Sequence, residues 1–179
     1  MSNAVSPISC IEGLAQLLSD AELRQQYAKD PELVAGQLGI CAGERHLFIA
    51  LPVEQLAIQA ELLLKKRMRE AWKIIPLSFN GLGEAAATHF YAYAGRYWPD
   101  TWRRHVQDAW HFCRYLQDEG LPWNRSEWNR LDFVYQRRYC RLGIVSDVMV
   151  AGKNTTALQL LYRKDGRMQQ RIFYLGTGW

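Results

Sequence analysis

The spacing of apolar residues changes once along this chain, near Tyr139, and that change constrains the fold more than any other feature. Before it, apolar side chains recur every three or four residues, the period of an amphipathic helix. After it, residues 140–150, 155–162 and 168–175 are rich in aliphatic and β-branched side chains, and Asp165-Gly166 forms a hairpin signal between the last two runs. We therefore predict an α+β fold, in which an N-terminal multi-helix region is followed by a C-terminal three-stranded antiparallel sheet.

The helical part is expected to contain short helices around one long one. Apolar residues at helical spacing run from Pro52 to Ile75 and predict one long helix, which Pro76 should end. Ser19 and Glu22 form a capping box that predicts one helix start, and Asp30-Pro31 predicts another. The shorter helices are expected at about 8–18, 20–29, 31–38, 47–51, 82–98, 101–118 and 124–137, with Asp100 and Asn124 as caps of the last two.

A run of turn-forming residues from Ser78 to Gly83 is the best candidate boundary inside the chain. It separates a helical region, residues 1–78, from residues 79–179, which carry three helices and the sheet. Because 179 residues suffice to bury one sizeable core, we expect the two regions to pack as one compact unit.

The uneven distribution of charge says more about partners than the net charge of +4. Residues 1–60 carry three basic and seven acidic side chains, whereas residues 61–179 carry nineteen basic and eleven acidic ones. A positive surface accelerates encounter with anionic molecules. Nucleic acid, an acidic peptide or an acidic protein face would each suit the C-terminal part, and a solvated basic surface explains the same pattern.

No motif for catalysis or metal binding stands out. The four cysteines lie far apart without a C-x-x-C pair, which favours buried, reduced thiols. His105 and Asp108 lie one turn apart on a predicted helix, where a hydrogen-bonded surface pair is the favoured interpretation, and His111 lies too far around that helix to share a metal with them. Because nucleophile and phosphate-binding motifs are also missing, we expect no catalysis by the chain alone and no cofactor within it.

The sequence also predicts a cytoplasmic location. No apolar run approaches the roughly 20 residues that cross a bilayer. The N-terminus lacks the basic flank and apolar stretch of a signal peptide.

Basic and aromatic residues suggest two binding surfaces. An exposed edge strand of the predicted sheet could accept an acidic peptide as an added strand, although basic residues also protect such edges from aggregation. The predicted peptide-binding residues are Arg137, Arg138, Arg141, Arg163, Lys164, Arg167 and Arg171. Aromatic residues interleaved with arginines are typical of protein interfaces. The predicted partner-interface residues are Trp98, Trp102, Arg103, Arg104 and Trp123.

Several short motifs together resemble a known group of proteins. They are Leu18-Ser-Asp-x-x-Leu23-Arg24-x-x-Tyr27-x-x-Asp30-Pro31, the long helix, Phe90-Tyr91-x-Tyr93-Ala94 through Tyr97-Trp98-Pro99, Arg104-His105-x-x-Asp108-Ala109 and the closing sheet. With these motifs the chain resembles the small accessory proteins that work beside multinuclear non-heme iron oxidative enzymes in ribosomal peptide modification, as in the 3-thiaglutamate pathway.

The resemblance implies that the chain is the non-catalytic half of a heterodimer. It would bind a leader or carrier peptide and present the cysteine-containing C-terminus of that peptide to a barrel-fold partner that holds the iron. The usual peptide-recognition element of such pathways has its strands before its helices, whereas here they follow. No binding residue is therefore carried over by motif.

Three other interpretations remain open. The first third of the chain, through Leu23-Arg24-x-x-Tyr27 to Asp30-Pro31, also resembles the small helical subunit of ring-opening dioxygenases. Alternatively, three helices followed by a hairpin have the order of a winged-helix nucleic-acid-binding regulator, with Lys164–Arg167 as the wing tip. Its groove-reading residues would be Arg125, Arg130, Arg137 and Arg138. The last interpretation is an enzyme that uses His105 and Asp108 as acid and base.

Overall fold

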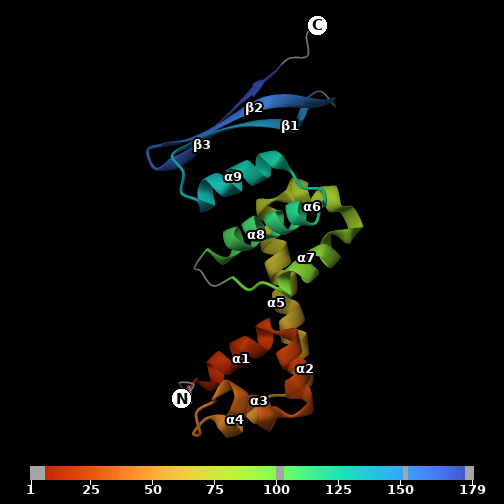
Figure 1. Cartoon of the computed structure of the whole chain (residues 1–179), viewed down its shortest axis with the longest axis vertical. Helices are drawn as coiled ribbons and strands as arrows, with labels where there is room; N and C mark the ends of the chain where they lie inside the picture. Colours follow the sequence, from red (N-terminus) through yellow and green to blue (C-terminus); the bar gives the residue numbers. More distant parts are fainter. Residues whose placement is uncertain (1–6, 100–102, 151–152, 176–179) are drawn as a thin grey trace. The chain divides into compact units, whose positions relative to one another are not determined.

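Helices occupy the first part of the chain and a single sheet the last part (Figure 1). The structure, a computed structural model, describes residues 7–99, 103–150 and 153–175. The predicted α+β fold, with helices first and a three-stranded antiparallel sheet last, is confirmed. The chain divides into two units, residues 1–66 with 94–98 and residues 67–93 with 99–179, and the division falls inside the long helix α5 (Val53–Ile74).

The first unit is built from short helices that close around Tyr27. They are α1 (Cys10–Ser19), α2 (Ala21–Lys29), α3 (Pro31–Leu38) and α4 (Arg45–Ile49), followed by the first part of α5. The Tyr27 ring meets Phe48 edge-on at 5.4 Å between centroids. Its hydroxyl donates to the carbonyls of Phe48 and Leu51. The polar group of this fully buried side chain is therefore hydrogen-bonded, at the point where α4 meets the start of α5.

The helix starts of this unit follow local rules, with one correction. Asp30 and Pro31 begin α3 as predicted. Helix α2, however, is capped by Asp20 rather than Ser19, because the Asp20 carboxylate accepts the backbone N–H groups of Glu22 and Leu23. The Ser19 hydroxyl instead donates back to a carbonyl of α1. The carboxylate at the positive end of α2 also complements the helix dipole.

In the second unit the predicted turn at Ser78–Gly83 is wrong. Residues Pro76–Leu82 form helix α6, followed by a 3-10 turn at Gly83–Ala85. Phe79 on α6 is fully buried and contacts the rings of Trp72, Phe90 and Phe112. Burial of this aromatic side chain outweighs the weak helix propensity of the surrounding Ser, Asn and Gly residues.

The remaining helices of this unit are α7 (Ala86–Ala94), α8 (Arg104–Asp118) and α9 (Arg125–Tyr135). Helix α7 is shorter than the predicted 82–98. Helix α9 starts at the predicted cap, where the Asn124 side chain accepts the N–H of Glu127. The predicted cap Asp100 lies outside the described residues.

The sheet has the order β1-β2-β3, with strands β1 (Cys140–Val150), β2 (Lys153–Lys164) and β3 (Arg167–Tyr174). Asp165 and Gly166 both have positive φ, 50° and 73°, as the predicted two-residue hairpin turn requires. Helix α9 packs against β1 and β2 on one face of the sheet and against α8 on its other side (Figure 1). No helix among the described residues has both the length and the apolar character needed to cross a membrane.

Candidate functional site

Strand β3 forms an open edge of the sheet. It pairs with β2 from Arg167 to Tyr174, and no described strand pairs with its other side. Seven of its eight residues are exposed, and Ile172 is half-buried. A strand with an unpaired side offers a row of backbone N–H and C=O groups that an extended chain can complete.

The register separates the two faces of the sheet. Residues directly opposite each other in neighbouring strands share a face, so Arg163 and Met168 lie on one face, and Leu160 and Arg171 lie on the other. The guanidinium of Arg163 lies over the ring of Phe133 on α9, 5.3 Å from its centroid. Met168 is therefore on the face that α9 covers, whereas Arg171 is on the outer face.

The outer face is apolar at its centre, a feature that was not predicted from the sequence. Leu142, Ile144 and Phe173 are 61%, 53% and 48% exposed, so no described helix covers them. The alternation of apolar residues along each strand was the available signal, but a period of two does not say which face meets the helix.

The side chains of four of the seven predicted peptide-binding residues make no hydrogen bond or ion pair with any residue that the structure describes. They are Arg137, Lys164, Arg167 and Arg171, and all are exposed. Lys164 and Arg167 oppose each other beside the hairpin turn, and Arg171 lies four residues further along β3 on the same face. Lys164, Arg167 and Arg171, which we call the β3 cations, can meet an anion without first breaking an internal side-chain contact.

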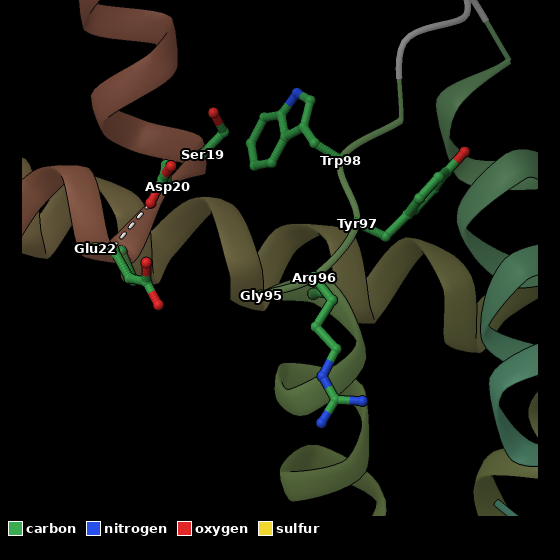
Figure 2. Close-up of a pocket in the computed structure, with 9 residues that line it drawn as sticks. Ser19, Asp20, Glu22, Gly95, Arg96, Tyr97 and Trp98 are labelled. Carbon is green, nitrogen blue, oxygen red and sulfur yellow. Dashed lines mark hydrogen bonds between the residues drawn. The ribbon is translucent and has the colours of Figure 1, made fainter.

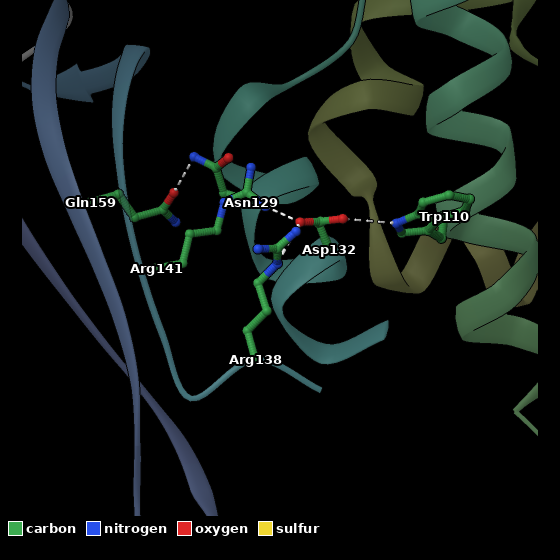
Figure 3. A network of polar contacts seen from close by, with 6 residues as sticks. All are labelled: Trp110, Asn129, Asp132, Arg138, Arg141 and Gln159. Carbon is green, nitrogen blue, oxygen red and sulfur yellow. Dashed lines mark hydrogen bonds and ion pairs between the residues drawn. The ribbon is translucent and has the colours of Figure 1, made fainter. Parts of the chain in front are cut away.

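The side chains of the other three basic residues are engaged within the protein, and Figure 3 shows two of them, Arg138 and Arg141. Arg138 and Arg141 both pair with the carboxylate of Asp132 on α9, which also accepts the indole N–H of Trp110 at 3.4 Å. Arg163 donates to the carbonyl of Arg138 at 3.0 Å. These arginines join α9 to the sheet, and their first role in the structure is to fix that packing.

Buried amides reinforce the same joint. The Asn129 amide donates to Gln159 Oε1 at 2.9 Å (Figure 3). The Gln159 amide in turn donates to the Ser126 hydroxyl at 3.0 Å. A Cβ at Gly143 would lie 2.8 Å from Asn129 Nδ2. Glycine therefore lets the helix approach β1 closely at this position.

The structure places the predicted partner-interface residues in different units. Trp98 belongs to the first unit, where it lines an open pocket of about 530 Å³ with Ser19, Asp20 and Glu22. Figure 2 shows its indole beside Ser19, while Arg96 points away. Arg103, Arg104 and Trp123 belong to the second unit, and Trp102 lies outside the described residues.

The expected surface pair of His105 and Asp108 is wrong. Asp108 is fully buried and accepts hydrogen bonds from Arg67, at 3.1 and 2.7 Å, and from the Tyr93 hydroxyl, at 3.1 Å. His105 is exposed. The described residues contain no group of three or more His, Cys, Asp or Glu side chains placed to hold a metal.

The cysteines differ in environment, so the expectation of uniformly buried thiols is corrected. Cys113 is buried, Cys10 and Cys41 are half-buried, and Cys140 is exposed. Burial, and secondarily the charge of Glu127, raises the pKa of the Cys113 thiol to about 12. Burial is also the main cause that raises the pKa of Cys10, with smaller contributions from Glu44 and Cys41.

Alkylation of the native chain with iodoacetamide should therefore modify Cys140 early and Cys113 only after unfolding. A thiol whose pKa is raised stays protonated, and the thiolate is the reactive form. Peptide mass spectrometry over a time course measures the order, with urea-denatured chain as the control in which all four cysteines react. Early labelling of Cys113 in the folded chain would show that this helix packing opens readily.

Comparisons with known proteins match part of the chain. No curated protein and no solved structure shows significant similarity to it. One protein-family model does match, but its description mentions neither iron nor peptide modification. The resemblance to accessory proteins of iron enzymes therefore stays a prediction. Residues 51–118, from the start of α5 to the end of α8, are similar to the family described as SCO6045-like, C-terminal domain.

Proposed function

We propose that this chain is a peptide-binding accessory subunit of a multinuclear iron oxidative enzyme. In this function it binds an acidic leader or carrier peptide along β3 and presents the cysteine-containing C-terminus of that peptide to the barrel-fold enzyme. The partner holds the iron, and this chain contributes recognition.

The observation that carries the proposal is the open edge of β3 beside the β3 cations. An added strand gains main-chain hydrogen bonds along the edge, which give affinity without requiring a particular sequence. The cations then select for acidic side chains, since hydrogen bonds between charged groups are stronger than neutral ones. The outer face of the sheet remains available to the enzyme.

The double substitution Arg167→Glu with Arg171→Glu should weaken binding of an acidic peptide by about tenfold or more, because each charge-assisted contact contributes roughly 1.5–3 kcal/mol. Fluorescence anisotropy of a labelled synthetic peptide, rich in Asp and matched in length to β3, measures the affinity. The matched control is Lys66→Glu with Arg69→Glu, which changes the net charge equally at exposed positions of α5 that do not belong to the sheet. Equal weakening by both variants would mean that only the overall charge attracts the peptide.

The iron partner requires a separate test. The tagged chain, purified from cells that make it naturally, should retain a stoichiometric barrel-fold protein with several irons per chain. A preparation that binds the acidic peptide but retains no iron protein would leave a peptide-binding protein and remove the enzyme partner from the proposal.

The alternative of a nucleic-acid-binding regulator has less support, because α9 is packed on two sides. Glu127, Asn129, Leu131, Asp132 and Phe133 on this helix are buried. A groove-reading helix needs a free face. Binding of a DNA duplex that weakens by roughly a thousandfold between about 50 and 200 mM salt would nonetheless favour this alternative, since phosphate contacts release counterions.

A further inference from the structure

A groove lies directly beneath the open edge of the sheet, within the second unit. It has a volume of about 410 Å³ and opens between α9, the first turn of α8, the end of α5 and β3. Its walls are largely apolar and come from Ile74, Val106, Leu131, Val134 and Met168. Met168 is 37% exposed, and Ile74, Val106 and Val134 are half-buried, so apolar surface in the groove is still open to solvent.

Met168 connects this groove to the edge strand. It lies on the α9 face of β3, as its pairing with Arg163 establishes. In a strand added beside β3, the residue opposite Met168 would lie on the same face. Its side chain would therefore enter the groove rather than solvent.

The neighbouring positions of β3 face the other way. Arg167 opposes Lys164, and Arg171 opposes Leu160 on the outer face. The residues of an added strand opposite Arg167 and Arg171 would thus lie on the outer face beside the β3 cations. Acidic side chains fit these two positions.

The charges around the groove agree with an acidic peptide. The Glu127 carboxylate is buried and already accepts the N–H groups of Leu77 and Ser78. Lys73 pairs with Glu70 at 2.7 Å. The side chain of Arg130, which also lines the groove, makes no hydrogen bond or ion pair with a described residue. Its guanidinium can therefore meet an acidic group of the peptide at the wall of the groove.

We propose that this groove is an anchor pocket for one bulky apolar side chain of the peptide strand. Together with the β3 cations it selects the pattern acid, apolar, any, any, acid in a strand parallel to β3, and the reverse order in an antiparallel strand. This inference rests on the proposed function and adds to it a sequence preference that the charges alone do not create.

Synthetic peptides test the pattern with the full-length chain. One pair has Asp-Leu-Thr-Thr-Asp or Asp-Ala-Thr-Thr-Asp at its centre, and a second pair has the reverse order of each, with identical flanks. The leucine peptide of one pair should bind roughly tenfold more tightly than its alanine partner. The larger side chain buries more apolar area in the groove, and roughly 1.4 kcal/mol of additional binding free energy is a factor of ten in affinity. The pair that shows the difference gives the direction of the strand.

Variants of the groove identify where the leucine binds. Val134→Trp fills the groove, and Met168→Ser removes part of its wall at an exposed position that tolerates change. Each should reduce the preference for leucine while leaving the affinity for the alanine peptide nearly unchanged. Leu142→Trp is the matched control on the outer face and should keep the preference, and circular dichroism with urea unfolding checks that every variant is folded.

The outcomes separate the two proposals. Equal affinity of the leucine and alanine peptides in both orders, or a preference that survives in both groove variants, overturns the anchor pocket and leaves peptide binding in place. If none of the peptides binds, the peptide-binding function and the anchor pocket are both overturned.

Discussion

Asp108→Ala should destabilise the chain by about 3–5 kcal/mol, the cost of leaving one partner of a buried ion pair uncompensated. Asp108 is fully buried, and Arg67 is 6% exposed. The Arg67 guanidinium donates to both carboxylate oxygens of Asp108. Without the carboxylate, the Arg67 guanidinium would remain buried between α5 and α8 but would lose its ion pair with Asp108. Urea unfolding followed by tryptophan fluorescence measures the loss.

Two companion variants separate charge from packing. Tyr93→Phe removes the hydroxyl that donates to Asp108 but leaves the charge pair intact, so it should cost only about 1–2 kcal/mol. Arg67→Met with Asp108→Leu replaces both charges and should be more stable than Asp108→Leu alone. A loss below about 1 kcal/mol for Asp108→Ala would mean that water reaches this site and solvates Arg67.

Glu127→Ala should lower the free energy of unfolding by about 3 kcal/mol or more, because its one buried carboxylate accepts hydrogen bonds from three donors. Glu127 accepts the backbone N–H groups of Leu77 and Ser78 at 2.7 and 2.8 Å and the Ser78 hydroxyl at 2.8 Å. These donors begin α6, which places Phe79 in the aromatic core. Loss of Glu127 should therefore loosen α6 as well as the start of α9.

Hydrogen exchange of the α6 amides, with urea unfolding, measures this effect. Glu127→Gln keeps one acceptor oxygen and should lose roughly half as much stability. Glu84→Ala is the matched control, since Glu84 is an exposed acid of the neighbouring 3-10 turn and should change stability by less than about 0.5 kcal/mol. Protection of the α6 amides that is unchanged in Glu127→Ala would show that aromatic packing alone holds this helix.

Glu127 also shows why part of the fold could not be predicted. With Asn124 its spacing predicts a capping box, and Asn124 does cap α9. The Glu127 side chain, however, binds α6, about 50 residues earlier in the sequence. Because the stabilising partner is distant, residues 78–83 look like a turn when they are considered alone.

The candidate site, too, could be predicted from the sequence only in part. The sequence predicts the β3 hairpin and its basic residues, since turn chemistry and strand period act between near neighbours. It cannot tell that Arg138, Arg141 and Arg163 are engaged with α9 while Arg167 and Arg171 are not. Arg141, which lies on β1, meets Asp132 because α9 packs on this face of the sheet.

By itself, then, the sequence determined that helices come first and strands last, the starts of α3, α5 and α9, the hairpin at Asp165-Gly166 and the basic character of the C-terminal part. These properties depend on contacts within a few residues. The tertiary structure alone decided that Asp108 is buried, that Pro76–Leu82 is helical and that a groove opens beneath Met168. Each of these depends on which distant surfaces meet, and local period and propensity carry no information about that choice.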